Sequence, residues 1–325
     1  MRQISFREAI REALIEEMTR DERVFIMGED IGPYGGVYRV TEGLWEKFGE
    51  NRVIDTPISE SAVMGAAVGA ALNGTRPILE IMFADFLTLC MDHIVNGAAK
   101  VCYQYDGEMS CPLVVRAPIG ITGGGAGVHH SQSCEAWFLN VPGLKVVIPS
   151  TPYDAKGLLK SAIRDDNPVL FFEHKLLYNV VGDVPEDEYT IPIGKADVKL
   201  DGSDVTIVAN ALMMHRALEA AKKLKDEGIS CEIVDPRSLL PLDEDLIIGS
   251  VKKTGRLVIV QEAPKMYGYG AEIAAMISEK ALEYLDAPVK RVANPGTPIP
   301  YTANLEQAVI PKVGDIIKAV KDIVT

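Results

Sequence analysis

Cysteine is scarce in this chain of 325 residues, and its few cysteines lack the spacing of any common site. The five positions are odd in number, and no pair has the spacing of a zinc knuckle or a redox dithiol. They are Cys90, Cys102, Cys111, Cys134 and Cys231. We expect reduced side chains that mostly pack inside an intracellular protein.

An excess of positive charge is also absent. Lys and Arg total 33 against 46 Asp and Glu, so the formal net charge is −13. Such a surface repels nucleic acid and anionic lipid, and no clustered basic stripe opposes this repulsion. No uncharged run is long enough to span a membrane, and a capping box at Ser5 and Glu8 leaves no room for a signal peptide. These features argue against nucleic-acid and membrane partners and favour a cytoplasmic location.

Complete nucleotide-binding motifs are missing as well. The cluster Gly120–Gly127 lacks the Lys-Ser or Lys-Thr of a phosphate-binding loop. The segment Gly268–Ile273 begins like a dinucleotide fingerprint but has Ile273 where the third glycine is needed. A tight turn between a strand and a helix explains this second segment. A nucleotide-dependent oxidoreductase therefore remains only as a rival hypothesis.

Short apolar segments alternate with helical segments along the whole chain. The predicted helices include one from about Asp85 to Lys100 and one that Thr151 caps, with Pro152 at its first position. This pattern predicts an α/β protein whose mainly parallel sheets are covered by helices on both faces. The length suits two domains, and the turn formers and acids of Gly182–Glu188 mark the boundary. We predict a first domain over 1–184, a linker over 185–199 and a second domain over 200–325.

Glu60 stands at the mouth of a predicted helix made almost wholly of small and apolar residues, Ser61–Leu72. A carboxyl group held against an apolar wall can be kept near neutrality and serve as a proton donor. The alternative is an acid that caps the helix or complements its dipole. Position alone favours this alternative.

Two adjacent histidines, His129 and His130, follow the first glycine cluster. Glycine-rich loops run over the surface and often carry function, and a histidine there can exchange protons near neutral pH. A solvent-exposed or loop-bracing pair is the alternative.

The order of several motifs identifies a family. The chain resembles the beta subunit of the thiamine-diphosphate-dependent decarboxylating component of 2-oxo acid dehydrogenase complexes, a group that includes acetoin dehydrogenase beta subunits. The motifs that carry this resemblance are Asp55–Glu60, Arg76–Ile78, Phe83–Phe86, His130–Ser133, Val141–Val147, Thr151–Leu159, Ala162–Pro168, Val234–Arg237 and Lys253–Val258. The resemblance implies a pyrimidine-binding domain followed by a transketolase-type C-terminal domain.

The resemblance also implies roles for single residues. Glu60 corresponds to the acid that hydrogen-bonds the aminopyrimidine ring of the cofactor, and His130 to the histidine linked to proton transfer during acyl transfer onto lipoamide. Ile58, Met82 and Phe86 match positions that pack around the cofactor. His129 departs from the glutamine or tyrosine expected before the active-site histidine.

A potassium site is implied on the same ground. The matching positions, chiefly backbone carbonyls with one carboxylate, are Leu113, Ala162, Ile163, Asp165 and Asn167. A simple turn at a helix end is the alternative interpretation.

One family motif is absent from this chain. Thiamine enzymes hold the diphosphate through a metal-binding Gly-Asp-Gly segment, but Tyr105–Gly107 and Leu200–Gly202 both lack the first glycine. We therefore expect an alpha subunit to hold the diphosphate and its magnesium in an α2β2 assembly, and the beta chain to be inactive alone.

The expected activity is that of an oxidoreductase with a lipoyl disulfide acceptor. A 2-oxo acid such as pyruvate would be decarboxylated, or acetoin cleaved, and the acyl group passed to the lipoyl group of an acyltransferase core. The segment Glu173–Tyr178 favours pyruvate or acetoin weakly. A branched-chain 2-oxo acid dehydrogenase subunit and a non-catalytic scaffold subunit are the alternatives.

Overall fold

The computed structural model describes residues 1–324, which form two compact units. Unit 1 comprises residues 1–119 and 138–193, and unit 2 comprises residues 120–137 and the chain from Gly194 onward. The division at 184 with a linker over 185–199 stays a prediction. It did not anticipate that segment 120–137, which carries both adjacent histidines, groups with the C-terminal half of the chain.

Unit 1 is built on a parallel sheet with its strands in the order β6-β7-β5-β4-β2-β3. A separate antiparallel pair joins β1 to β8. The strands are β1 (Arg2–Ser5), β2 (Val24–Gly28), β3 (Val53–Asp55), β4 (Arg76–Glu80), β5 (Val114–Ile119), β6 (Lys145–Val147), β7 (Val169–His174) and β8 (Val181–Val184). All residues of β4, β5 and β7 are buried, as expected for central parallel strands.

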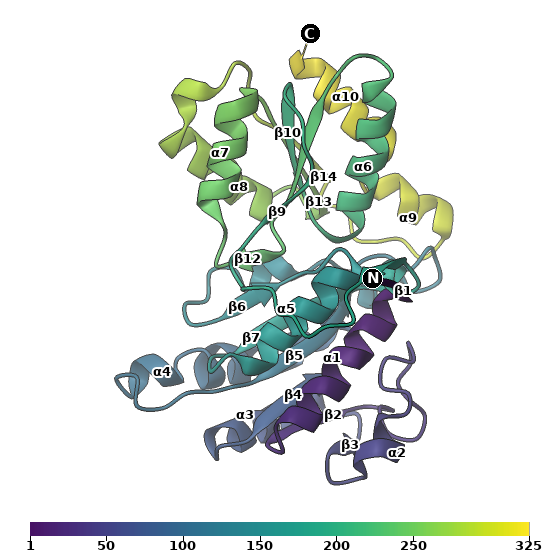
Figure 1. Ribbon diagram of the computed structural model, residues 1–325, viewed down its shortest axis with the longest axis vertical. Coiled ribbons are helices and arrows are strands. Elements are labelled where there is room, and N and C mark those ends of the chain that lie inside the picture. The colour runs from purple at the N-terminus through teal and green to yellow at the C-terminus, as the bar shows by residue number, and fades with distance from the viewer. Residues whose placement is uncertain (325) are drawn as a thin grey trace. The chain divides into compact units, whose positions relative to one another are not determined.

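Two capped helices pack along one face of this sheet. They are α1 (Phe6–Arg20) and α5 (Pro152–Arg164), which lie side by side in Figure 1. The expected capping box is confirmed, since the Ser5 side chain accepts from the Glu8 N–H while the Glu8 carboxylate accepts from the Ser5 N–H. Thr151 caps α5 in the predicted way, with Pro152 in its first turn.

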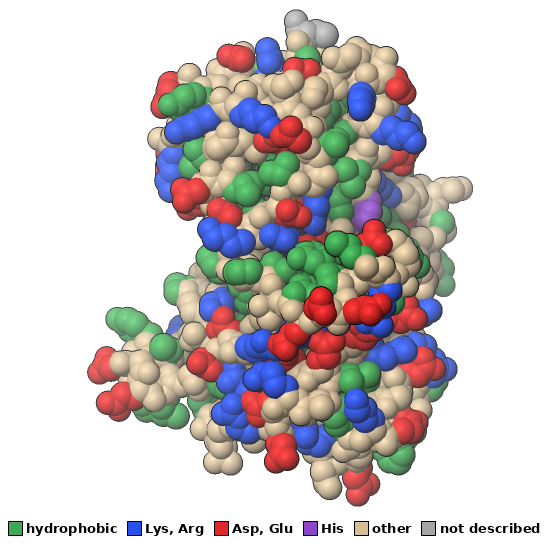
Figure 2. All heavy atoms as spheres, viewed as in Figure 1, with side chains coloured by type: hydrophobic (Ala, Val, Ile, Leu, Met, Phe, Trp, Pro, Cys, Tyr) green, Lys and Arg blue, Asp and Glu red, His purple; other side chains and the backbone are tan. Residues whose placement is uncertain are grey.

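Ion pairs join these two helices. Lys156 Nζ lies 2.6 Å from a carboxylate oxygen of Glu16, and Lys160 Nζ lies 2.6 Å from the other. Figure 2 shows acidic and basic side chains mixed on this face of unit 1.

The small-residue segment forms α3 (Glu60–Leu72) as expected, but the next helical segment is irregular. A single helix was predicted over about 85–100. The chain instead forms a 3₁₀ segment η1 (Ala84–Cys90), a π-helical turn η2 (His93–Ala98) and the short α4 (Val101–Gln104). Gly97 and the β-branched residues of this segment have low helix propensity, and packing of both η1 and η2 against α3 sets their path. The short α2 (Leu44–Phe48) completes the α-helices of unit 1 within the described residues.

Unit 2 contains a sheet in the order β14-β13-β10-β11-β9, parallel except for the edge strand β9. Its strands are β9 (Asp197–Leu200), β10 (Val205–Ala209), β11 (Cys231–Asp235), β13 (Leu257–Pro264) and β14 (Lys290–Asn294). The short strand β12 (Ser238–Leu240) of unit 2 does not belong to this sheet. Its helices are α6 (Ala211–Lys225), α7 (Glu244–Thr254), α8 (Tyr269–Lys280), α9 (Ala303–Val309) and α10 (Val313–Val324).

Helices cover both faces of this second sheet. In Figure 1, α6 and α10 lie together on one face, with α7 and α8 on the other. The core of unit 2 joins the apolar sides of α6 and α10 to β10, β11 and β13. The predicted α/β architecture of two mainly parallel sheets is therefore confirmed. Within residues 1–324, no helix is both long enough and apolar enough to cross a membrane.

Candidate active site

Glu60 is the first residue of α3 and is half-buried. Ser59 at the N-cap makes no side-chain capping bond, and the Glu60 carboxylate accepts no hydrogen bond within residues 1–324. The Cys90 thiol donates to the Glu60 backbone carbonyl at 3.4 Å, which ties α3 to η1. Burial and, after it, the charge of Glu60 raise the pKa of Cys90 to about 12 and also raise the pKa of Glu29.

The other predicted cofactor-packing residues also belong to unit 1. Ile58 is 81% exposed although it is large and apolar. Met82 and Phe86 are half-buried on the segment that leads from β4 into η1, and the Phe86 N–H donates to the Phe83 carbonyl at 2.8 Å. Since η1 packs against α3, the structure brings this segment next to the helix that begins with Glu60. We call Ile58, Glu60, Met82 and Phe86 the rim.

A buried ionic network lies at the ends of the central strands of unit 1. The Arg116 guanidinium donates to both carboxylate oxygens of Glu173, at 2.6 and 2.8 Å, and also to Glu80. Tyr178 donates its hydroxyl proton to Glu173 at 2.7 Å and stacks on Tyr38 at 4.6 Å between ring centroids. Each charged group of the network thus has hydrogen-bond or ion-pair partners, which buried charges need in order to be stable.

This network braces the segment that carries Met82 and Phe86. Tyr38 meets the ring of Phe83 edge-on at 6.1 Å, and the Lys175 ammonium lies 4.9 Å from the centre of the same ring. Burial by itself would lower the pKa of Arg116, but the nearby carboxylates of Glu173 and Glu80 have the larger effect and raise this pKa. Burial, with the charge of Glu173, raises the pKa of Glu80. The segment Glu173–Tyr178, which weakly suggested a substrate, thus has a structural role in this unit.

His129 and His130 lie in unit 2, at the end of the glycine loop. His129 is exposed and His130 is half-buried. Two buried carboxylates bind the amides of this loop. Glu306 of α9 accepts from the N–H groups of Gly123 and Gly124 at 2.7 and 3.1 Å, and Glu262 of β13 accepts from the N–H of Ile121 at 2.8 Å.

A third buried acid, Glu135, lies just beyond this loop. Its side chain is 2% exposed, and its Oε2 atom has no hydrogen-bond partner within residues 1–324. Burial, together with the charge of Glu262, raises the pKa of Glu135 to about 7. Burial and the charge of Glu135 in turn raise the pKa of the Tyr269 hydroxyl.

Both glycine clusters are explained by close packing. In the first, the amides of Gly123 and Gly124 are already bound by Glu306. In the second, Gln261 Oε1 accepts from the Gly270 N–H at 2.8 Å, and a Cβ on Gly268 would lie 1.8 Å from Gln261 Nε2. These contacts support the turn interpretation and give a nucleotide phosphate no free amides at these positions.

The residues proposed for potassium come together where α5 ends and β5 and β7 begin. Oxygens of Leu113, Ile163 and Asp165 already have donors. Arg76 donates to the carbonyls of Ile163 and Asp165 at 2.9 and 2.6 Å, the Leu113 carbonyl accepts from a backbone N–H at 2.9 Å, and the Asp165 carboxylate pairs with Lys145. These contacts fit the helix-end turn, and a bound potassium ion stays a prediction.

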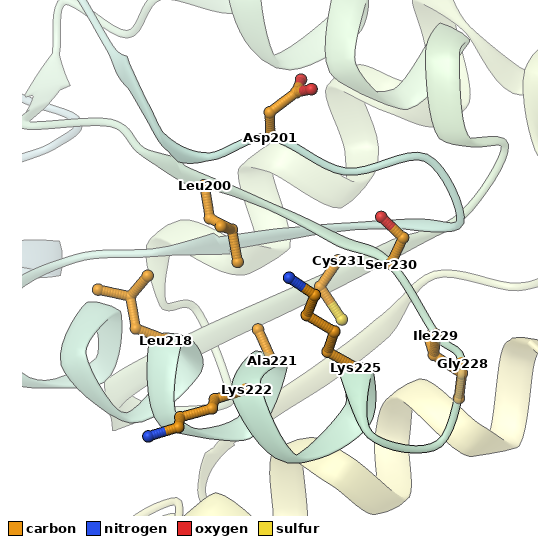
Figure 3. Close-up of a pocket in the computed structure, with 10 residues that line it drawn as sticks. All are labelled: Leu200, Asp201, Leu218, Ala221, Lys222, Lys225, Gly228, Ile229, Ser230 and Cys231. Carbon is orange, nitrogen blue, oxygen red and sulfur yellow. The ribbon is translucent and has the colours of Figure 1, made fainter.

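Two cavities lie within unit 2. One, of about 380 Å³, is lined by loop and turn residues that include His129, Gln132, Glu262 and Asn294. The other, of about 510 Å³, lies between α6 and the β9–β11 edge, and Lys225 extends toward Leu200 and Cys231 (Figure 3). Neither cavity was predicted. Within residues 1–324, no three His, Cys, Asp or Glu side chains are placed to hold a metal ion.

Sequence reasoning missed the buried charges. Among them are Glu80, Arg116, Glu173, Glu262 and Glu306. The signal for four of these was a charged residue in an otherwise apolar strand: Glu80 after Ile78-Leu79, Arg116 after Val114-Val115, Glu173 after Phe171-Phe172, and Glu262 shortly after Val258-Ile259-Val260. Glu306 carries no such signal, because it lies on a short helix whose other side chains are mostly exposed or half-buried.

The rim fits the pyrimidine end of thiamine diphosphate. A half-buried carboxylate without an internal donor offers an acceptor, and the exposed Ile58 and half-buried Phe86 offer apolar surface. The cofactor-binding role that the family resemblance implies for these four residues stays a prediction.

Comparison with known proteins establishes the family. Residues 2–181 match the transketolase pyrimidine-binding domain, and residues 194–316 match the transketolase C-terminal domain. A solved split-gene transketolase, described as an inactive beta4 tetramer, superposes with a TM-score of 0.81 at 26% identity, covering 99% of this chain and 98% of its own.

Curated relatives agree with the domain matches. The 2-oxoisovalerate dehydrogenase subunit beta of Bacillus subtilis is 52% identical over 94% of this chain and 93% of its own. The pyruvate dehydrogenase E1 component subunit beta of Rickettsia bellii is 49% identical, covering 99% and 98%. The acetoin:2,6-dichlorophenolindophenol oxidoreductase subunit beta of B. subtilis is 47% identical, covering 97% and 96%. The chain therefore belongs to the family of thiamine-diphosphate-dependent 2-oxo acid and acetoin dehydrogenase beta subunits.

Proposed function

We propose that this chain is the beta subunit of a pyruvate or acetoin dehydrogenase that transfers the acyl group of its substrate to a lipoyl group. The observation that carries the proposal is the rim, whose Glu60 carboxylate accepts no hydrogen bond within residues 1–324 and whose other side chains are apolar. The relatives named for pyruvate and acetoin support this substrate class. The 52% identity to a 2-oxoisovalerate subunit keeps a branched-chain substrate as the second candidate.

Each proposed residue has a physical task. When bound, thiamine diphosphate supplies the carbon nucleophile that attacks the oxo carbon of the substrate. Glu60 holds a proton shared with the pyrimidine ring, and Ile58, Met82 and Phe86 exclude water from that ring. His130 gives a proton to the lipoyl sulfur that does not take the acyl group.

The rim covers only one end of the cofactor, so an alpha subunit is part of the proposal. That subunit would hold the diphosphate and magnesium in an α2β2 assembly, which then meets a lipoyl-carrying acyltransferase core. The word "subunit" in the names of the relatives supports such a partner. A cytoplasmic location is also part of the proposal, since the five cysteines are free thiols and four of them are buried.

The test is Glu60→Gln in the assembly reconstituted with an alpha subunit. We expect turnover to fall at least about 100-fold, with unchanged assembly, because the amide cannot hold the shared proton. Glu50→Gln, the same change at an exposed acid of unit 1, is the control. Wild-type turnover in Glu60→Gln and in His130→Ala would instead support a non-catalytic scaffold. A panel of pyruvate, acetoin and 2-oxoisovalerate on the wild-type assembly identifies the substrate.

A further inference from the structure

The glycine loop that carries the histidines is closed on itself and fixed at several points. The Gly120 N–H donates to the Gln132 carbonyl at 3.0 Å, so the two ends of the loop meet. Between these ends, backbone amides point at carboxylates rather than at solvent. This loop is therefore held by specific groups of unit 2.

Glu306 makes the central contact. Its side chain is fully buried, and its two oxygens bind the successive amides of Gly123 and Gly124. Hydrogen bonds from N–H groups to an ionised acceptor are stronger than those between neutral groups. The next amide, Gly125, donates to the Tyr301 carbonyl at 2.8 Å, so three successive amides are bound to one short segment.

The backbone conformation of Gly124 permits this close approach. Its φ is +108°, and a Cβ at this position would lie 2.8 Å from the side chain and 2.9 Å from the backbone nitrogen of Ala303. A side chain here would push the loop away from α9. The glycines thus serve contact with α9, which explains why the motif resembles a phosphate loop without being one.

Both carboxylates belong to firmly anchored elements. Arg216 of α6 donates to the Gln307 side chain at 3.0 Å and to the Pro311 carbonyl, which fixes the C-terminal end of the α9 region. Glu262 lies on β13, which pairs with a strand on each side, and accepts from Ser133 at 3.3 Å as well as from Ile121. The two carboxylates therefore hold the loop by hydrogen bonds to residues before and after the histidines.

We propose that Glu306 and Glu262 are positioning residues that fix the His129–His130 loop for acyl transfer. The role of His130 in this inference rests on the proposed function. The hydrogen bonds that hold the loop to the two carboxylates are a property of the chain and do not depend on that function. Glu306 acts through the amides of Gly123 and Gly124, and Glu262 through Ile121 and Ser133. Neither acid is assigned contact with the substrate.

The first experiment measures amide hydrogen exchange over residues 120–133 in the reconstituted assembly. We expect Glu306→Gln to speed exchange at Gly123 and Gly124 by about tenfold or more, with Glu306→Asp intermediate. Glu283→Gln, the same change at an exposed acid of unit 2, should leave exchange unchanged. If Glu306→Gln fails to fold, Gly124→Ala displaces the loop without altering either acid. Wild-type protection in both variants would overturn the proposal.

The second experiment separates positioning from stability. We expect Glu306→Gln to lower turnover with the lipoyl acceptor (lipoyl-linked turnover) by about tenfold or more. Turnover with an artificial dye as the electron acceptor in place of the lipoyl group (dye-linked turnover) should stay within about twofold, and Glu306→Asp should restore part of the loss. Faster exchange with wild-type lipoyl-linked turnover would overturn the positioning role, provided that His130→Ala impairs that turnover. If His130→Ala is fully active, the proposed role of His130 fails, and the exchange result alone decides whether the acids hold the loop.

Discussion

The rim of unit 1 and the glycine loop of unit 2 satisfy their polar groups in opposite ways. At the rim, Ile58 is 81% exposed and the Glu60 carboxylate has no donor within residues 1–324. In the loop, the amides of Ile121, Gly123, Gly124 and Gly125 are all bound within the same unit. The rim is open and the loop is closed.

This difference distinguishes a surface that can still bind a ligand from a loop whose hydrogen bonds are already made. An acid without an internal donor is stable because water or a ligand can reach it, and exposed apolar surface is removed from water only when a ligand or partner covers it. Amides bound by buried carboxylates are already in their final arrangement. Under the proposed function, a ligand and an alpha subunit would complete the rim, whereas the amides of the loop are already bound within unit 2.

The largest expected effect on stability comes from removing Arg116, the shared cation of the buried ionic network in unit 1. Arg116→Leu would leave Glu80 and Glu173 buried without their shared cation, and breaking a buried ion network in this way costs about 3–5 kcal/mol. Thermal unfolding of the purified protein should show a lower Tm. Arg23→Leu, which removes an exposed ion pair, is the control and should change Tm little. A wild-type Tm for Arg116→Leu would show that the rim does not depend on this network.

A smaller effect is expected at Glu135, next to the closed loop. Folding raises the pKa of this acid from 4.5 to about 7, so the folded state binds its proton more tightly than the unfolded chain does. The contribution of Glu135 to stability is therefore greatest below pH 4.5 and is lost as the pH rises to about 7. The full change corresponds to about 3 kcal/mol.

Glu135→Gln removes this titration while keeping the shape of the side chain. Urea unfolding at several pH values should show that the variant loses the decline in stability between about pH 4.5 and 7 that the wild type has. Glu283→Gln provides the exposed control. An identical pH dependence in Glu135→Gln and wild type would mean that the carboxyl is not held neutral beside Glu262.

The smallest effect on stability is expected at the open rim. Ile58→Ser should change the unfolding free energy by less than about 0.5 kcal/mol because its side chain is already in solvent. Val63→Ser, on the buried side of α3, should cost about 2 kcal/mol or more. Ile58→Ser should nevertheless weaken the binding of thiamine diphosphate to the assembly, measured by calorimetry. Unchanged cofactor affinity would remove Ile58 from the rim.

The regular elements could be predicted because their signals are local. The Ser5–Glu8 capping box, the Thr151-Pro152 helix start and the apolar strands each depend on neighbouring residues, and the structure confirms them. The helix expected over 85–100 was wrong in detail because packing against α3 overrides the weak helical preference around Gly97. The role of Glu60 could be predicted only through the ordered family motifs, since its position alone favours an acid that caps the helix.

By itself, the sequence determined the α/β class and the family and predicted the residues of the rim, because periodicity, caps and ordered motifs lie within short stretches of chain. Only the tertiary structure showed that Arg116 binds Glu80 and Glu173 and that Glu306 holds the amides of Gly123 and Gly124, partners up to 183 positions apart. The physical reason is that a buried charge takes whichever partner the fold brings near it. Sequence spacing does not encode that partner.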